Sequence, residues 1–134
     1  VIFASHGGLS KGMKDSVSMI VGDLATDIET YSLLPGQNPE DFYQEVLKEA
    51  KESEEQILIL CDIKGGSVHT ALSKLAVLDN VMVFSGLNMG LALDAVMKSV
   101  GGNLELADAN DLIEAAKDGM TVMNGITSED DEDF

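Results

Sequence analysis

Two residues with side chains suited to group transfer directly follow apolar segments of the sequence. His6 stands in "ASHGG", after the apolar start of the chain, and Asp62 opens "DIKGGS", after the apolar residues 57–61. A neutral imidazole can attack through one ring nitrogen while a carboxylate accepts a hydrogen bond from the other, which fixes the tautomer and stabilises the cation that forms. We therefore predict that His6 is the nucleophile and that Asp62 orients it.

The remainder of "DIKGGS" has the composition of an anion-binding segment. Gly65 and Gly66 allow the backbone to approach a ligand closely. Ser67 is expected in the first turn of a helix, where unpaired N–H groups attract anions. We predict that Gly65, Gly66 and Ser67 bind an anion, for which a phosphoryl group is a candidate.

Each of these residues also has an ordinary structural explanation. A histidine before two glycines is often a turn residue, and an aspartate after a strand often caps a helix. A metal site is disfavoured because the chain has one cysteine and two histidines, and the second histidine, His69, is expected to be a partly exposed helix residue. The pairing of His6 and Asp62 at strand ends, beside a glycine-serine segment, favours a function.

The residues that position this pair alternate between strand and helix patterns. Apolar runs predict strands at residues 1–4, 28–33, 57–61 and 81–84, and a short last strand at residues 120–123. The fold class is α/β, an open doubly wound and mostly parallel sheet in the order 2-1-3-4, flanked by helices. In that order the first and third strands are neighbours, so His6 and Asp62 face each other where such sheets bind ligands.

Apolar spacing predicts the helices between these strands and their buried faces. The first ends near Gly22 and buries Met13, Val17, Ile20, Val21 and Leu24. The second is capped by Asn38, has Pro39 at its first position, and buries Phe42, Val46, Leu47 and Ala50. The third buries Val68, Ala71, Leu72 and Leu75, the fourth spans about residues 89–100, and the last is capped by Asp108 or Asn110.

Length and charge limit the classes of function. The 134 residues predict one domain at 1–126, followed by an acidic and disordered tail at 127–134. A formal charge of −16 repels phosphate backbones, which argues against nucleic-acid binding. The single cysteine, Cys61, lies in an apolar run and is expected to be a buried core residue. Neither a signal peptide nor an apolar stretch of about 18 residues is evident, so we expect a cytoplasmic protein.

Known catalytic motifs of other α/β proteins are absent. The sequence contains no G-x-S-x-G, no G-x-x-x-x-G-K-[ST] and no G-x-G-x-x-G. A phosphate-accepting receiver domain needs an acidic pair after its first strand, where this chain has "SHGG".

Three motifs together, "ASHGGLSKGM", "DIKGGS" and "SGLNMGLALDAV", resemble the mannose-family enzyme IIA domain of the bacterial phosphoenolpyruvate-dependent sugar phosphotransferase system (PTS). The resemblance covers residues 1 to about 123. It implies that His6 accepts a phosphoryl group from phosphorylated HPr through its outer ring nitrogen and passes it to a IIB component. It also implies that Asp62 holds the inner nitrogen and that Ser67 hydrogen-bonds the phosphoryl oxygens.

The resemblance further implies an assembly and a place in the cell. Such domains form homodimers that exchange a terminal strand, for which residues 120–123 are the candidate. They need no metal and no organic cofactor, and they act at the membrane only indirectly, through IIC and IID components.

The sequence departs from the family pattern after the third strand. The family usually has an apolar residue before its two glycines, then Ser-Pro and an asparagine, where this chain has Lys64 and "SVHT". Two alternative functions remain: the phosphocarrier subunit of a dihydroxyacetone kinase, and a regulatory module that senses phosphorylation in a transcription regulator.

Overall fold

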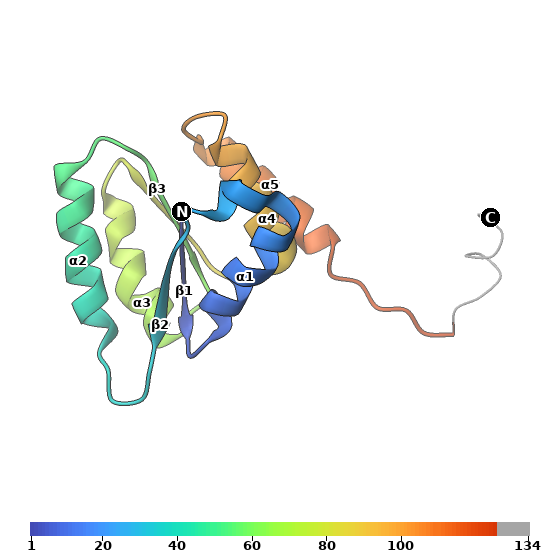
Figure 1. Ribbon diagram of the computed structural model, residues 1–134, viewed down its shortest axis with the longest axis horizontal. Helices are drawn as coiled ribbons and strands as arrows, with labels where there is room; N and C mark the ends of the chain where they lie inside the picture. Colours follow the sequence, from blue (N-terminus) through green and yellow to red (C-terminus); the bar gives the residue numbers. More distant parts are fainter. Residues whose placement is uncertain (126–134) are drawn as a thin grey trace.

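The chain folds as a four-stranded parallel sheet between two layers of helices (Figure 1). The computed structural model describes residues 1–125. Its strands are β1 Ile2–His6, β2 Glu29–Leu33, β3 Ile57–Cys61 and β4 Val81–Phe84, in the order β2-β1-β3-β4. All neighbouring strands are parallel. The predicted fold class and strand order are confirmed, and β1 and β3 occupy the centre of the sheet.

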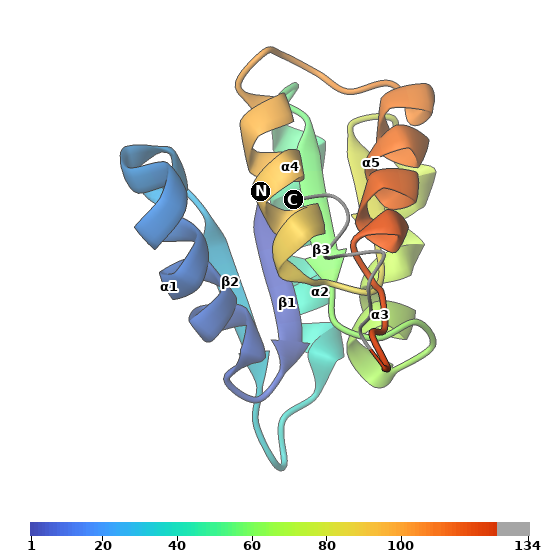
Figure 2. The ribbon, with the colours of Figure 1, turned by 90° about the vertical axis from the view of Figure 1, so that its right-hand side faces the viewer.

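Helices cover both faces of the sheet, as the two views show (Figures 1 and 2). They are α1 Leu9–Val21, α2 Pro39–Glu52, α3 Ser67–Leu72, α4 Met89–Ser99 and α5 Leu106–Asp118, with short 3-10 helices η1 Gly22–Ala25 and η2 Ser73–Val77. The helices α2 and α3 pack on one face, and α1, α4 and α5 pack on the other. None of the helices in residues 1–125 combines the length and apolar character needed to cross a bilayer.

The central strand β3 is buried on both faces, which explains its unbroken apolar sequence. Because successive side chains of a strand point to opposite faces, Leu58 and Leu60 pack against the layer of α1, α4 and α5. Ile59 and Cys61 pack against the layer of α2 and α3. The strand therefore joins the two halves of the core and fixes the position of the residue that follows it.

The predicted buried face of the first helix is only partly correct. Met13 and Val17 are buried, and Val21 packs beside them, as an i, i+4 stripe requires. Ile20 is 64% exposed and Leu24 is 48% exposed, so placing them in the core was wrong. The α-helical period ends where Gly22 takes a φ of 59° and a tighter 3-10 turn follows, so Leu24 no longer continues the stripe.

The helix caps show one confirmed prediction and one that was wrong. Asn38 caps α2, and its side chain accepts a hydrogen bond from the Glu40 N–H. The last helix starts earlier than predicted, with Glu105 as its N-cap. Asp108 lies one turn inside the helix and accepts from the Glu105 N–H at 2.9 Å. Acidic residues are favoured both at the cap and three residues later, so composition alone placed the start too late.

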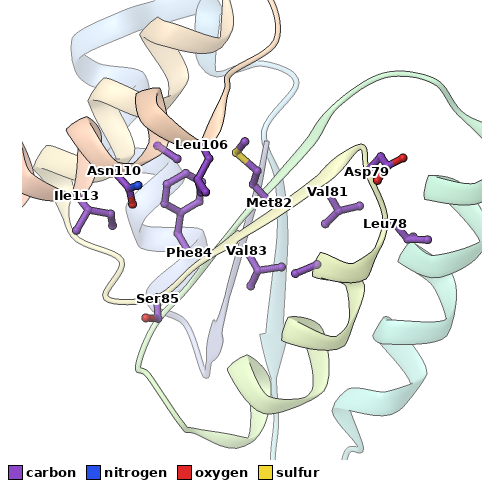
Figure 3. Close-up of a pocket in the computed structure, with 12 residues that line it drawn as sticks. Leu78, Asp79, Val81, Met82, Val83, Phe84, Ser85, Leu106, Asn110 and Ile113 are labelled. Carbon is purple, nitrogen blue, oxygen red and sulfur yellow. The ribbon is translucent and has the colours of Figure 1, made fainter.

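The outer strand β4 has a cavity of about 460 Å³ beside it. Side chains of β4 and α5 line it, among them Met82, Phe84 and Ile113 (Figure 3). Residues 120–123 follow α5 and run away from the body of the molecule (Figure 1). They pair with no strand in residues 1–125, so the strand predicted there does not form within this single chain, because a strand needs a neighbour to bond with. The tail predicted at residues 127–134 lies outside the described residues.

Candidate functional site

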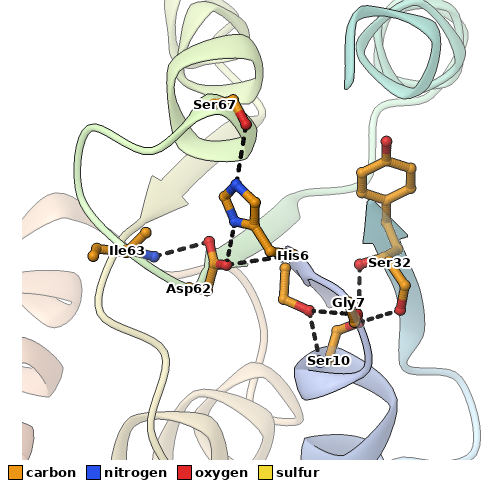
Figure 4. A network of polar contacts seen from close by, with 9 residues as sticks. His6, Gly7, Ser10, Ser32, Asp62, Ile63 and Ser67 are labelled. Atoms are coloured by element: carbon orange, nitrogen blue, oxygen red, sulfur yellow. Dashed lines mark hydrogen bonds and ion pairs between the residues drawn. The ribbon is translucent and has the colours of Figure 1, made fainter. Parts of the chain in front are cut away.

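The carboxyl ends of β1 and β3 bring His6 and Asp62 into direct contact (Figure 4). The two strands pair in parallel, with Ala4 opposite Cys61, and the Asp62 N–H continues the ladder by donating to the Ala4 carbonyl at 3.1 Å. The His6 Nδ1 atom lies 2.8 Å from Asp62 Oδ2. The predicted juxtaposition of these two residues is therefore present in the structure.

Asp62 is held in its ionised form by hydrogen bonds. Its side chain is only 9% exposed, and this burial acts to raise its pKa. The hydrogen bonds that it accepts from the His6 N–H, the His6 ring and the Ile63 N–H outweigh burial and bring the pKa below its usual value. Asp62 is therefore a carboxylate at neutral pH, and every contact it makes here is that of an acceptor.

The charge on Asp62 determines the tautomer of His6. Because a carboxylate has no proton to donate, Nδ1 of His6 must carry the proton, and Nε2 of the neutral ring then has a free lone pair. The Ser67 hydroxyl lies 3.1 Å from Nε2 and is the donor in that contact. The His6 side chain is 49% exposed, so its nucleophilic nitrogen lies at the surface.

The loop between β3 and α3 lies against the imidazole. Gly65 has a φ of +80°, a conformation that favours glycine, and Gly66 is closely packed. A Cβ atom at Gly66 would lie 2.7 Å from Ile63 Cγ2 and 3.3 Å from His6 Cε1. The Gly65 N–H donates to His69 Nδ1 at 3.0 Å, and the Gly66 N–H donates to the Ile63 carbonyl at 3.1 Å. Both N–H groups are thus engaged within the loop, while Ser67 faces His6 directly.

Two buried serines hold the turn that carries His6, and the sequence interpretation missed both. The Ser5 hydroxyl accepts from the Ser10 N–H at 2.8 Å and donates to the Gly7 carbonyl at 3.2 Å. The Ser10 hydroxyl donates to the Tyr31 carbonyl at 2.9 Å (Figure 4). Both side chains are fully buried, and buried hydroxyls require such partners. The only signal in the sequence was Ser5, a polar residue that directly follows the apolar residues 1–4.

The remaining candidate groups have other roles. Cys61 is fully buried, and burial together with the Asp62 charge raises the pKa of its thiol to about 12, which keeps it protonated and unreactive. His69 lies in α3 and bonds to the loop instead of to His6. Within residues 1–125, no three or more His, Cys, Asp or Glu side chains are grouped so that they could hold a metal ion.

Comparison with known proteins connects this geometry to a class. The family model EIIA-man, described as the PTS system fructose IIA component, matches residues 1–116. The PTS system sorbose-specific EIIA component of Klebsiella pneumoniae is 33% identical over 97 residues, which is 71% of this chain and 70% of that protein.

Solved structures agree with the family match. The PTS IIA protein associated with the fucose utilization operon of Streptococcus pneumoniae has a TM-score of 0.74 at 27% identity and covers 90% of both chains. The mannose/sorbose specific IIA subunit from Enterococcus faecalis has a TM-score of 0.78 and covers 94% of this chain and 95% of that chain. Its 23% identity supports the fold alone.

The fold and these matches define a IIA component of a sugar phosphotransferase system. The chain belongs to the EIIA-man family, whose model spans most of its length. The resemblance seen in the sequence is confirmed, and the chain is a phosphotransferase component.

Proposed function

We propose that His6 is the transient phosphoryl acceptor of this IIA component. Its Nε2 lone pair attacks the phosphorus of the phosphohistidine on HPr, the donor N–P bond breaks, and an Nε2–P bond forms on His6. A second transfer to a IIB component reverses these events and frees His6. The observation that carries the proposal is the 2.8 Å contact between Nδ1 and Asp62, because it leaves Nε2 unprotonated at the surface.

The neighbouring residues orient His6 and contact the phosphoryl group. Asp62 orients the ring and offsets the positive charge that develops on the imidazole when Nε2 is phosphorylated. Ser67 turns its hydroxyl from Nε2 to a phosphoryl oxygen. Gly65 and Gly66 shape the loop beside the incoming group, and their N–H groups reach a phosphoryl oxygen only if the loop bonds that they now make are released.

The surface around His6 suits a protein as the phosphoryl donor. Exposed apolar side chains follow the carboxyl ends of β1, β2 and β3, at the same edge of the sheet as the site, namely Leu9, Leu34 and Ile63. An exposed apolar group beside a nucleophile suits contact with HPr or IIB more than with a small polar substrate. The acidic charge of the chain would steer basic partner surfaces toward it. We place this relay in the cytoplasm, with no cofactor, and with IIC and IID as the membrane components.

The second part of the proposal is a homodimer that exchanges its terminal strand. Along residues 1–125, β4 bonds to a strand on one side only, and its other side faces the cavity that α5 also lines. Residues 120–123 are exposed and lie outside the body of their own chain. Addition of this segment to β4 of a second copy would pair the backbone N–H and C=O groups at the free edge of β4 with those of the exposed segment.

The test of the carrier function is a reconstituted relay. The chain is incubated with phosphoenolpyruvate, enzyme I and HPr, and its intact mass is measured before and after acid treatment. One acid-labile phosphoryl group should appear on the wild type and be absent from His6→Ala. Equal labelling of both proteins would remove His6 as the acceptor. Addition of the IIB component should then discharge the wild type, whereas a stable phosphorylated state would favour a regulatory module.

A further inference from the structure

The helix that follows the glycine loop contributes a second histidine to the support of the site. We propose that His69 is a positioning residue for phosphoryl transfer, and that its Nδ1 atom holds the loop of residues 63–66 against His6. The inference rests on the proposed carrier function of His6. His69 does not touch the reacting atoms, so its effect must pass through the loop.

The backbone N–H and the carbonyl of Gly65 both form hydrogen bonds with side chains of α3. Its N–H donates to His69 Nδ1 at 3.0 Å, and its carbonyl accepts from the Thr70 hydroxyl at 3.3 Å. The next carbonyl, that of Gly66, accepts from the Thr70 N–H at 2.8 Å. The bond to His69 is the only one of the three that a ring nitrogen accepts, and within residues 1–125 the Gly65 N–H bonds to no other group. Residue 69 therefore decides whether this backbone group is held.

A small movement of this loop reaches the imidazole directly. Gly66 lies so close to His6 that an added Cβ atom would be 3.3 Å from His6 Cε1. Ser67, the next residue, has its hydroxyl 3.1 Å from His6 Nε2. Gly65 adopts a φ of +80°, is exposed, and has no atom within 4 Å of the position that a Cβ would occupy, so hydrogen bonds hold it more than packing does. Loss of the His69 bond should therefore loosen the surface that faces the phosphoryl group.

The acceptor chemistry of residue 69 can be separated from its size. Nδ1 accepts from Gly65 only in the neutral ring that carries its proton on Nε2. In His69→Asn, the carbonyl oxygen occupies a position the same number of bonds from the backbone as Nδ1, so the acceptor is kept. In His69→Leu, a methyl group takes that position and the acceptor is lost. Ser73→Ala is the matched control, because the Ser73 hydroxyl bonds only within its own turn, to the Thr70 carbonyl.

The transfer experiment measures single-turnover phosphorylation of each variant over a range of phospho-HPr concentrations. We expect His69→Leu to lower the rate at saturating donor about fivefold, the effect of one lost hydrogen bond, and to leave the half-saturating concentration unchanged. His69→Asn should stay within about twofold of the wild type, since it keeps the acceptor. Ser73→Ala should match the wild type. Equal slowing by Leu and Asn, or no slowing by Leu, would overturn the proposal.

A second measurement reports on the bond without any phosphoryl donor. In the unphosphorylated wild type, imidazole 15N shifts should show His69 protonated at Nε2 and free at Nδ1, and the Gly65 amide should exchange slowly with solvent. The Gly65 amide should exchange faster in His69→Leu and remain slow in His69→Asn. A proton on Nδ1 of the neutral wild-type ring would refute the proposal even if His69→Leu failed to fold. Failure of His6 to be phosphorylated in every variant would instead refute the carrier function and leave these NMR results intact.

Discussion

Asp62 Oδ2 accepts two hydrogen bonds from His6, one from its backbone N–H and one from its Nδ1–H, each at 2.8 Å. The same oxygen thus ties both the main chain and the ring of one residue. The imidazole is fixed relative to the end of β1 and not only relative to the aspartate side chain. This double contact explains why the ring can be half exposed and still have one orientation.

Replacement of Asp62 by asparagine should slow phosphorylation of His6 roughly 100-fold. An amide can present its NH2 group to Nδ1, which would favour the tautomer with a proton on Nε2 and no lone pair there. The loss should be smaller than the about 10⁴-fold loss caused by the corresponding change in a serine protease triad, because here no proton has to be transferred. Single-turnover transfer from phospho-HPr measures it, and a wild-type rate in Asp62→Asn would contradict the assigned role.

The same carboxylate should contribute to stability in a pH-dependent way. The pKa of Asp62 is lower in the folded protein than its usual value of 3.8, so its contribution is fully present above that value and is lost as pH falls through the folded pKa. The difference in unfolding free energy between wild type and Asp62→Asn should therefore shrink as the pH falls below about 4. Urea unfolding at several pH values below about 5 measures this difference, and a difference that grew over that range would show the opposite sign.

Alanine at the two loop glycines should act by different routes. Gly66→Ala introduces a Cβ atom against Ile63 and His6. Its main effect should be a slower phosphoryl transfer to His6, and its effect on the free energy of unfolding should be small. Gly65→Ala meets open space but strains a backbone with φ of +80°, at a cost of about 1 kcal/mol of stability. Gly22→Ala is a control with a positive φ of 59° at the far end of α1. It should lose stability in thermal unfolding and transfer phosphoryl groups at the wild-type rate.

Removal of the buried hydroxyl in Ser10→Ala should cost about 1 to 2 kcal/mol of unfolding free energy. The hydroxyl donates to the partly buried Tyr31 carbonyl, and its loss leaves that carbonyl with one bond fewer. Ser18→Ala is the comparison, because its exposed hydroxyl bonds only to the Asp15 carbonyl of the same helix. Urea unfolding of the two variants should differ clearly, and equal stability would show that the Ser10 contact contributes little.

The exchange of a terminal strand can be tested by truncation. A chain that ends at Gly119 lacks residues 120–123 and should be a monomer in sedimentation experiments, whereas a chain that ends at residue 126 should remain a dimer. The shorter chain keeps all the helices and strands described here, so far-ultraviolet circular dichroism should show its fold intact. A dimer of the shorter chain, or a monomer of both, would argue against strand exchange.

The sequence was sufficient for the part of the site that depends on topology. His6 and Asp62 each end a buried strand, and in a parallel sheet those ends meet at one edge, so their contact followed from the strand order. The bond between Gly65 and His69 depends on the path of a loop, which residue types do not specify. Leu24 was misplaced because a helical period predicts a face only while the helix continues, and the chain leaves that period after Val21.

The ladder contact between the Ala4 carbonyl and the Asp62 N–H has a consequence for quality control in the cell. The nucleophile and its partner are 56 residues apart and meet only after β1 and β3 have paired. Such a pairing requires a long stretch of chain to close, and as the buried centre of the sheet it is lost only when the core itself opens. A nascent or damaged chain would therefore present an ordinary solvated histidine, and the capacity to be phosphorylated would itself report that the centre of the sheet is assembled.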